Sequence, residues 1–316
     1  WPSLKRDLGS INNLLSPIFS AGFYYKTFMG PKGFWKNVYE PLIRRTAGLG
    51  KPPREFKSKS IHLHHNIDIL IVGGGLAGLL AAKKLAGTDQ DVLLVERDNN
   101  LGGILRNSNK IKSIDGQKSA DWIEKTEWLL KSANNIKILK NTTVTTYNYK
   151  DHLIAIEDKT VGTPPDNNKP ELVMHKIRTK HTVLANGHIE RFLSFRNNDL
   201  PGVMLAASFE KYIHRYGVVA DTSPVIFTNN SSTFSLLKTM VDMNHKPKAY
   251  VDVRDSKKIE KETLELINNY NIPFYPKSEI EGCEGKNQIE KVFIRTKKDK
   301  TLKIKTSMLC ISGGLN

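Results

Sequence analysis

Short apolar runs alternate with amphipathic stretches from residue 68 onward, and this pattern predicts strands that alternate with helices. The first strand is expected at Asp68–Val72 and the second at Asp91–Val95, with a helix between them that ends near Leu85. A helix at Asp121–Leu130 and strands at Ile136–Leu139, Thr142–Tyr147, Leu153–Glu157, Leu172–Ile177 and His181–Ala185 complete this group. Such alternation is typical of a doubly wound sheet.

The same alternation starts again after the Pro201-Gly202 break, and it predicts a second α/β unit. Helices are expected at Ser232–Met243 and Lys257–Asn269, and strands at Val225–Thr228, Ala249–Val253, Ile272–Tyr275, Ile289–Arg295, Leu302–Lys305 and Met308–Ser312. The predicted fold is therefore α/β, with two Rossmann-like dinucleotide-binding units in series. We expect residues 67–200, together with 307–316, to form the first unit and residues 201–306 to form the second.

Residues 1–66 show neither helical nor alternating spacing, although they are rich in aromatic side chains. These rings include Phe19, Phe23, Tyr24, Tyr25, Phe28, Phe34, Trp35 and Tyr39. Rings without a periodic pattern do not build a core of their own, so we expect an irregular arm that packs on another surface. His62, His64 and His65 have no spaced metal-ligand partner, which favours a linker over a metal site.

The charge of the chain is strongly positive but evenly spread. Its 48 Lys and Arg residues exceed its 32 Asp and Glu residues by 16, and the sequence pI is 9.6. The lysines are interleaved with Asn and Glu, and no aromatic RNA-binding signature occurs, which argues against a nucleic-acid partner. No apolar run reaches the roughly 18 residues of a membrane span, which argues against a membrane partner.

The inventory of reactive residues excludes several kinds of chemistry. Two cysteines, Cys283 and Cys310, are too few for a zinc cluster or a disulfide framework, and they point to a reducing, cytoplasmic location. No CxxxxC redox pair, GxSxG, HExxH or P-loop occurs, so we expect neither a catalytic residue nor a metal here. His188 is expected to be structural. The chain lacks an initiator Met and stops after a Gly-Gly pair, so we expect a segment of a longer protein.

Three glycines between the first strand and the first helix, Gly73, Gly75 and Gly78, form a GxGxxG fingerprint. The first permits a tight turn, the second lets a pyrophosphate approach the backbone, and the third lets the helix pack on the strand. Glu96 ends the second strand about 20 residues later, where its carboxylate can accept hydrogen bonds from ribose hydroxyls. Its charge disfavours a 2′-phosphate, although Arg97 beside it acts in the opposite sense. We therefore expect NAD or FAD rather than NADP.

The corresponding turn of the second unit has lost all three glycines, since its sequence is Thr228-Asn229-Asn230-Ser231-Ser232-Thr233. Side chains at these positions would crowd a pyrophosphate that lay on the turn. Two interpretations stay open: the second unit binds no dinucleotide, or its turn has another role.

Several longer segments resemble the alpha subunit of heterotetrameric sarcosine oxidase. They are WPSLKRDLGSINNLLSP (1–17), AGFYYKTFMGPKGFWKNVYEPLIRRTAGLG (21–50), GGGLAGLLAA (73–82), TVLANGHIERFLSFRNNDLPGVMLA (182–206), YGVVADTSPVIFTNNSS (216–232) and SGG (312–314). They follow one another along essentially the whole chain, and segments 21–50 and 182–206 are far more specific than a glycine fingerprint.

This resemblance implies two dinucleotide-binding units of the glutathione-reductase type, with NAD held by the first. It implies an oxidoreductase acting on CH–NH donors, in a flavoprotein complex with beta, gamma and delta subunits and with FMN at the interface with the beta subunit. The reaction would be a step of one-carbon metabolism that converts sarcosine to glycine, formaldehyde or methylene-tetrahydrofolate, and hydrogen peroxide. The family's ferredoxin-like and folate-binding domains are not among these 316 residues. The isolated segment is expected to be inactive with sarcosine, because the resemblance places sarcosine oxidation at a FAD in the beta subunit and no acid–base pair is visible here. The alternative is an alpha-type subunit of an opine-, proline- or glycine-oxidising flavoprotein dehydrogenase.

Matched residue by residue, the resemblance implies cofactor contacts at Gly73, Gly75, Leu76, Ala77, Gly78, Glu96, Arg97, Gly103, Ile104, Val144, Ala185, Gly187, Ser312, Gly313 and Gly314. Two turns depart from the family pattern, because Ala-Thr-Gly is Ala-Asn-Gly at residues 185–187 and Gly-Gly-Trp is Gly-Gly-Leu at residues 313–315. We further expect Asn229 and Asn230 to line the FMN side of the interface, because polar side chains suit a flavin better than a pyrophosphate.

Overall fold

This computed structural model describes residues 8, 11, 30–46, 48, 50, 60–108, 110–162 and 170–316, and it divides into the units Trp1–Lys57 and Ser58–Asn316. In the smaller unit a π-helical turn, η2 (Trp35–Tyr39), continues as helix α2 (Glu40–Thr46). Arg44 and Glu40, one turn apart and 2.5 Å from each other, form an ion pair that supports this helix. Residues 35–46 thus differ from the irregular arm expected over 1–66. The expected aromatic residues 19–28 lie outside the described residues.

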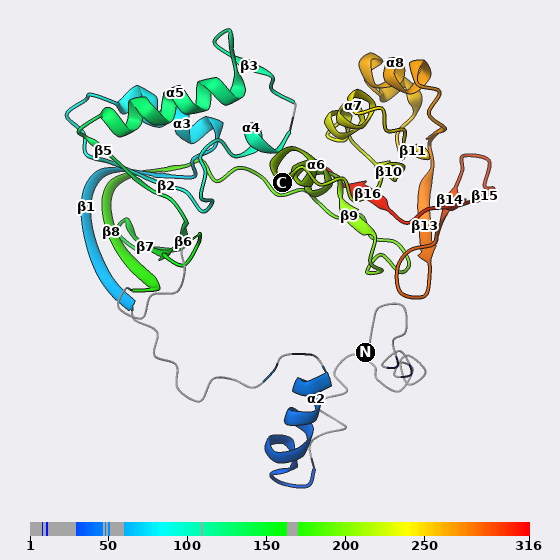
Figure 1. Cartoon of the computed structure of the whole chain (residues 1–316), viewed down its shortest axis with the longest axis horizontal. Coiled ribbons are helices and arrows are strands. Elements are labelled where there is room, and N and C mark those ends of the chain that lie inside the picture. The colour runs from blue at the N-terminus through cyan, green and yellow to red at the C-terminus, as the bar shows by residue number, and fades with distance from the viewer. Residues whose placement is uncertain are drawn as a thin grey trace. The chain divides into compact units, whose positions relative to one another are not determined.

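Six strands form the sheet of the first Rossmann-like unit, in the order β5-β2-β1-β8-β7-β6 (Figure 1). Their bounds are β1 (Ser60–Val72), β2 (Val92–Val95), β5 (Ile136–Leu139), β6 (Thr142–Asn148), β7 (His152–Asp158) and β8 (Leu172–Leu184). Strands β5, β2, β1 and β8 are parallel, whereas β8, β7 and β6 form an antiparallel meander. Helices join β1 to β2 and β2 to β5, as parallel neighbours require, whereas the chain reaches β8 through the antiparallel strands β6 and β7.

Apolar side chains cover both faces of this sheet. On one face, helices α3 (Leu76–Leu85) and α5 (Ser119–Ser132) pack on Ile71 and Leu94, with Trp122 buried between them. On the other face, Leu70 packs with Leu153 of the meander. Helix α4 (Ile104–Asn107) and the small hairpin of β3 (Ser113–Ile114) and β4 (Gln117–Lys118) lie in the connection before α5. The two cores fix where β1 and β2 end, and these ends carry the predicted site.

Strands β1 and β8 are longer than the sequence pattern indicates. They pair in parallel from Ser60 with Leu172 to Val72 with Leu184, and Figure 1 shows them curving side by side. A single strand therefore replaces the two that were expected at Leu172–Ile177 and His181–Ala185. No Pro or Gly interrupts either segment, and each strand satisfies the backbone of the other along its full length. The expected linker histidines, 62, 64 and 65, thus belong to β1.

Five parallel strands form the sheet of the second Rossmann-like unit, in the order β12-β11-β10-β16-β9. Their bounds are β9 (Val203–Leu205), β10 (Val225–Thr228), β11 (Ala249–Asp252), β12 (Phe274–Pro276) and β16 (Leu309–Ser312). One core packs Ile226 and Tyr250 of the sheet against helices α6 (Ala206–Tyr216), α7 (Phe234–Asp242) and α8 (Lys261–Asn269). A short 3-10 turn, η3 (Ser256–Lys258), precedes α8.

The opposite face of this sheet is covered by a three-stranded antiparallel sheet. Its strands are β13 (Glu279–Glu284), β14 (Lys291–Arg295) and β15 (Thr301–Lys305). Ile280 and Ile294 pack there on Val225, Val251 and Leu309. In both units helices cover one face of the parallel strands; the antiparallel strands continue the same sheet in the first unit and form a separate sheet in the second.

Strand β16 completes the second sheet, which differs from the expected grouping of residues 307–316 with the first unit. Leu309 pairs with Val225 of β10 on one side and with Val203 of β9 on the other. All four residues of β16 are buried. The backbone N–H and C=O groups of a buried strand need hydrogen-bond partners, so β16 needs a neighbouring strand on each edge. The gap between β10 and β9 supplies them.

Candidate functional site

The glycine turn after β1 has the geometry that a dinucleotide-binding fingerprint requires. Gly73 has a φ of +105°, and a Cβ there would lie 2.3 Å from the carbonyl oxygen of Ala185. A Cβ on Gly78 would lie 1.8 Å from the carbonyl oxygen of Gly73. Only glycine fits at these two positions, because real Cβ atoms do not approach backbone so closely. The helix can therefore pack directly on the end of the strand.

Open space lies over Gly75, the middle glycine of the fingerprint. A Cβ on Gly75 would meet nothing within 4 Å. Gly75 is also the N-cap residue of α3, and no side chain caps this end of the helix. The first N–H groups of a helix lack partners within the helix, and they favour an anion. The turn therefore presents bare backbone and a helix dipole to one open space.

Glu96 lies beside this turn at the end of β2. Its Oε2 accepts a hydrogen bond of 2.6 Å from the Gly74 N–H, and its Oε1 accepts one of 2.8 Å from the Asp98 N–H. A carboxylate oxygen has two acceptor sites, so each can still receive a ribose hydroxyl. The side chain is half-buried, whereas Arg97 next to it is exposed. The predicted acid thus lies where an adenosine ribose would follow the pyrophosphate.

A second glycine pair, Gly102-Gly103, lies against the fingerprint. The Gly102 N–H donates to the Gly74 carbonyl oxygen at 2.8 Å, and a Cβ on Gly103 would lie 3.1 Å from the Cα of Gly75. Ile104, the first residue of α4, is partly exposed. Gly103, which was predicted from the resemblance, is thus brought to the fingerprint, and the predicted Ile104 follows it in the chain.

The end of β8 forms another wall of the same turn. The Ala185 N–H donates to the Val72 carbonyl oxygen at 2.8 Å, and Ala185 contacts Gly73. Gly187 follows with a φ of +75°. Val144 is more distant: it packs on the meander face of the sheet, in strand β6, which begins where the Thr142 N–H donates to the Glu96 carbonyl oxygen at 2.9 Å.

Ser312, Gly313 and Gly314 are not brought to the first turn but to the second. The Ser312 Oγ lies 2.7 Å from the Ser232 Oγ, and the Ser312 carbonyl oxygen accepts from the Asn230 amide at 3.1 Å. The nearest neighbours of Gly313 are in residues 191 and 193, and those of Gly314 are in Asn230. The position of β16 in the second sheet explains this difference from the resemblance.

The second turn is closed by its own side chains. The Asn230 Oδ1 accepts the Ser232 N–H at 2.8 Å, and the Thr228 Oγ1 accepts the Asn230 N–H at 3.1 Å. At the end of β11, where the first unit has Glu96, Asp252 is fully buried and forms a two-pronged ion pair with Arg254. Arg254 also donates to the Ser231 Oγ at 3.0 Å. Asn229 is the exposed residue of this turn.

The cysteines are placed as structural residues. Both are buried and free, and they are the only two in the sequence. Burial raises the pKa of the Cys283 thiol to about 11 and raises the pKa of Cys310 as well, so neither forms the reactive thiolate easily. Among the described residues there is also no group of three or more His, Cys, Asp or Glu side chains that could hold a metal, and no helix among them is long and apolar enough to cross a membrane.

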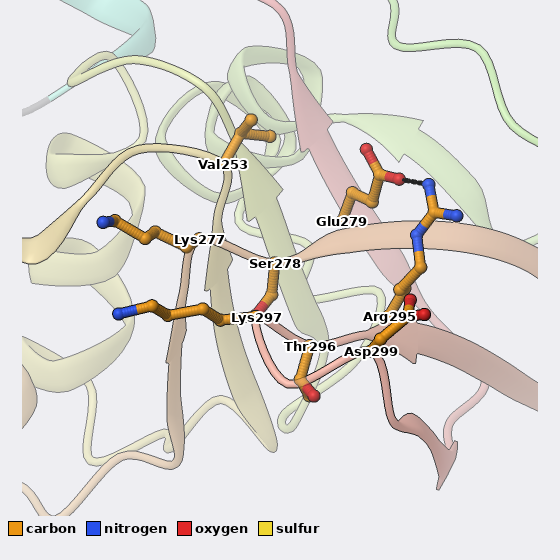
Figure 2. Close-up of a pocket in the computed structure, with 8 residues that line it drawn as sticks. All are labelled: Val253, Lys277, Ser278, Glu279, Arg295, Thr296, Lys297 and Asp299. Atoms are coloured by element: carbon orange, nitrogen blue, oxygen red, sulfur yellow. Dashed lines mark hydrogen bonds and ion pairs between the residues drawn. The ribbon is translucent and has the colours of Figure 1, made fainter.

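A hollow of about 370 Å³ opens on the second unit, and none of the predicted site residues lines it. It is lined by Val253, Lys277, Ser278, Glu279, Arg295, Thr296, Lys297 and Asp299 (Figure 2). Two of its cations are already paired, Arg295 with Glu279 and Lys277 with Asp255. We assign it no ligand.

One charged residue near the site was not predicted from the sequence. Arg215, at the end of α6, forms an ion pair of 2.6 Å with Asp98 in the loop after Glu96. The two residues are far apart in the sequence, and no local pattern joins them. Only the Gly217 that follows α6 was a visible signal, because it caps the helix in a left-handed conformation.

Comparison with known proteins assigns the fold to one class. The family model described as pyridine nucleotide-disulphide oxidoreductase matches residues 67–316, and the chain belongs to this family. This membership implies binding of FAD or NAD(P), in agreement with the glycine turn. The disulphide chemistry in the family's name has no cysteine pair in this chain to carry it.

Two relatives confirm the resemblance to sarcosine oxidase. The chain is 36% identical over 279 residues to the sarcosine oxidase subunit alpha of Rhizobium meliloti (strain 1021). The matched region covers 84% of this chain and 28% of that protein. It is 37% identical over 179 residues to the subunit alpha of Corynebacterium sp. (strain P-1), which covers 56% of this chain and 18% of that protein. The chain thus spans less than a third of the length of these relatives.

Solved structures confirm the fold class. The thioredoxin reductase of T. acidophilum matches with a TM-score of 0.59 and 15% identity, covering 79% of this chain and 78% of that one. The L-proline dehydrogenase of P.horikoshii matches with a TM-score of 0.52 and 19% identity, covering 84% of this chain and 45% of that one. At these identities the likeness concerns the fold alone, which is the predicted arrangement of two Rossmann-like units.

Proposed function

We propose that the turn Gly73–Gly78 binds the pyrophosphate and adenosine of NAD, and that FAD is the alternative ligand of the same turn. The observation that carries this proposal is the open space over Gly75, beside the uncapped start of α3. A pyrophosphate there would meet bare backbone and a favourable helix dipole. The ribose would then meet Glu96, whose carboxylate is already held by the Gly74 N–H.

The walls of the proposed site come from three other segments. Gly103 and Ile104 close one side, Ala185 and Gly187 the other, and Leu76 and Ala77 supply the first N–H groups of α3. Arg97 and Val144 are assigned to the adenosine end. The surroundings of Ser312–Gly314 do not support an expected contact with NAD, because these residues adjoin Asn230, so the proposal leaves them out.

Glu96 makes NAD the better ligand than NADP. A 2′-phosphate would lie against a carboxylate whose two oxygens are fixed by the N–H groups of Gly74 and Asp98. Like charges at such short distance are unfavourable, particularly where water is partly excluded. The carboxylate cannot swing away without losing both hydrogen bonds.

Isothermal titration of the chain with NAD, NADP and FAD tests this assignment. We expect Glu96→Ala to weaken NAD binding by about 1–3 kcal/mol, the cost of losing charge-assisted hydrogen bonds. Glu96→Gln keeps an acceptor for the Gly74 N–H, so it separates ribose recognition from support of the turn. Glu262→Ala, an exposed carboxylate on α8, serves as the control. Unchanged affinity in Glu96→Ala would remove the ribose assignment.

For the whole protein we propose an alpha-type subunit of a sarcosine oxidase, acting on a CH–NH donor. Both relatives reported above carry this name, and this proposal rests on that identity over part of their length. Sarcosine would be oxidised to glycine with release of formaldehyde, or of methylene-tetrahydrofolate, and oxygen would be reduced to hydrogen peroxide. The described residues supply a nucleotide site, so the reacting groups would come from partner chains, and we expect no peroxide from the isolated chain with sarcosine.

The partners would be beta, gamma and delta subunits, with FMN at the interface with the beta subunit. Asn229 is the exposed amide of the second turn, whereas both ends of the Asn230 amide are engaged within the molecule. Asn229→Ala should therefore lower the FMN content of the assembled complex and leave its NAD content unchanged. Equal loss of both cofactors would indicate misfolding, and unchanged FMN would remove Asn229 from the flavin side. A cytoplasmic location belongs to the same proposal, since both cysteines are free.

The alternative is an alpha-type subunit of an opine-, proline- or glycine-oxidising flavoprotein dehydrogenase. Purification of the full-length protein with its partners, followed by assays with sarcosine, proline and glycine, distinguishes the two. Peroxide formation with sarcosine supports the first proposal. Turnover of proline or glycine with an electron acceptor, and none with sarcosine, supports the alternative.

A further inference from the structure

Among the contacts between the two Rossmann-like units, one arginine reaches the loop that follows Glu96. Arg215 extends from the last turn of α6 to the loop that follows β2. Its Nη1 lies 2.6 Å from the Asp98 Oδ2, and its Nη2 donates to the Asn99 Oδ1 at 3.2 Å. The guanidinium thus uses two of its nitrogens on two neighbouring side chains. Such a fork is directional as well as attractive.

The second unit prepares Arg215 for this contact. The side chain is only 15% exposed, and its guanidinium carbon lies 5.7 Å from the centre of the Tyr216 ring. Arg215 occupies the end of α6, where the helix dipole favours a cation. The helix ends at Tyr216, and Gly217 is its C-cap residue. An arginine held in this way loses little further freedom when it binds Asp98.

The contact continues from Asp98 to the glycine turn through the backbone. The Asp98 N–H donates to the Glu96 Oε1 at 2.8 Å, while the Glu96 Oε2 accepts the Gly74 N–H at 2.6 Å. The position of residue 98 therefore fixes one oxygen of Glu96, and the glycine turn fixes the other. A shift of the loop at residue 98 would rotate the carboxylate that we assign to the ribose.

Charge reinforces this arrangement. Burial of Asp98 acts to raise its pKa, but the hydrogen bond and charge of Arg215 outweigh burial, so the pKa lies below its ordinary value. The hydrogen bond to Asp98 raises the pKa of Arg215, and the charge of Glu96 adds to this effect. Arg215 thus faces two carboxylates, and the charges of Lys211 and Arg97 also act on Asp98.

We infer that Arg215 is a positioning residue for the nucleotide: through Asp98 it holds Glu96 toward the adenosine ribose, and it ties α6 of the second unit to the loop after β2 in the first. This inference rests on the proposed binding of NAD at Gly73–Gly78. Because the relay reaches only the adenosine half, Arg215 affects ligands that contain adenosine and spares those that lack it.

The test uses the full chain and three ligands: NAD, ADP-ribose and nicotinamide mononucleotide, which lacks adenosine. Arg215→Ala is expected to weaken NAD and ADP-ribose about tenfold each, and Asp98→Asn to act in the same direction. Nicotinamide mononucleotide binding should not change. Arg215→Lys keeps the charge without the fork and should restore part of the affinity. The control is Arg196→Ala, which removes an exposed arginine 3.8 Å from Glu284.

A measurement without ligand separates this inference from the proposed function. In Arg215→Ala, amide hydrogen exchange at residues 74 and 98 should become faster, while exchange in β10 and β11 should stay as in the unchanged chain. If the unchanged chain binds no nucleotide, the proposed function fails and the ribose role with it, although faster exchange would still establish the relay. If the unchanged chain binds NAD but Arg215→Ala binds it within twofold, the inference on Arg215 is overturned. Equal weakening of all three ligands would overturn it too.

Discussion

The turn at Gly73–Gly78 and the turn at Thr228–Thr233 have the same place in the fold but different surroundings. Both follow the central strand of a parallel sheet and lead into a helix, α3 in the first unit and α7 in the second. Neither helix has a side-chain cap at its N-cap residue, but in the first turn the middle glycine faces open space. In the second, the Asn230 Oδ1 accepts a hydrogen bond from the Ser232 N–H, which is therefore not available to a phosphate.

The difference lies in what faces the end of each strand: open space over Gly75 in the first turn, and an internal acceptor for the Ser232 N–H in the second. A polar side chain in the turn replaces the ligand permanently, because an intramolecular acceptor is always present. Asp252 and Arg254 complete the replacement at the end of β11. A common fold thus yields one open turn and one closed turn.

The largest expected effect comes from the helix packing of the open turn. Gly78→Ala should lower the free energy of unfolding by about 4 kcal/mol or more, because its Cβ would lie 1.8 Å from a backbone oxygen that cannot move alone. Thr233→Ala at the matching position of the second turn should cost only about 1–2 kcal/mol, the loss of its hydrogen bond to the Tyr250 hydroxyl. Urea unfolding measures both, and equal costs would contradict the comparison.

Gly75→Ala probes the same turn without the packing cost. Its Cβ would meet no atom within 4 Å, so the free energy of unfolding should stay within about 0.5 kcal/mol of that of the unchanged chain. The methyl group would occupy the space proposed for the pyrophosphate, and NAD affinity should fall at least tenfold. A variant that keeps full affinity would locate the pyrophosphate elsewhere.

The closed turn should respond in stability and not in binding. Arg254→Ala leaves the fully buried Asp252 carboxylate without its cation, which costs about 3–5 kcal/mol. NAD affinity should be unchanged. The double variant Asp252→Asn/Arg254→Ala should cost less than the two single changes added together, since the unpaired charge is removed. Loss of NAD binding in a folded Arg254→Ala chain would mean that the second turn takes part in the nucleotide site.

A smaller effect is expected from Asn230→Ala. This change removes side-chain hydrogen bonds to the Ser232 N–H and to the Ser312 carbonyl oxygen, at about 1 kcal/mol each. The second turn would then be open but still crowded by Thr228 and Thr233, so no second equivalent of NAD should bind. Titration that reached two equivalents per chain would show that Asn230 alone keeps this turn closed.

The smallest expected effect is on how the stability of the first unit depends on pH. His65 lies 2.9 Å from His175, which lies 3.0 Å from the buried Glu157. Burial, followed by the charge of His175, lowers the pKa of His65, so folding favours its neutral form. Its contribution is present above the unfolded pKa of about 6.5 and is lost as the pH falls through the lower folded value. Thermal unfolding of His65→Gln should therefore depend less on pH between 7.5 and 5.5 than that of the unchanged chain; an identical slope would contradict this.

Sequence patterns predicted most parallel strands of both sheets because these strands are local features, although the short strand β9 was not predicted. Buried strands such as β2 and β10 appear as short apolar runs, and the fingerprint glycines mark the point where a strand meets a helix. Helix α6 was missed for a physical reason. Its N-cap, Leu205, forms no side-chain cap, and the Ala207 N–H is satisfied by Glu190 at 2.8 Å. A cap that comes from 17 residues earlier leaves no local signal.

What the sequence by itself determined is therefore the open first turn, the acid after β2 and the loss of glycines in the second turn, because each depends on a few neighbouring residues. Tertiary structure decided the partners. It placed β16 between β10 and β9, and so took Ser312–Gly314 to the second turn. It also brought Arg215 to Asp98. Periodicity records which face of an element is buried, but it does not record which distant element covers that face, since that choice depends on how the whole chain packs.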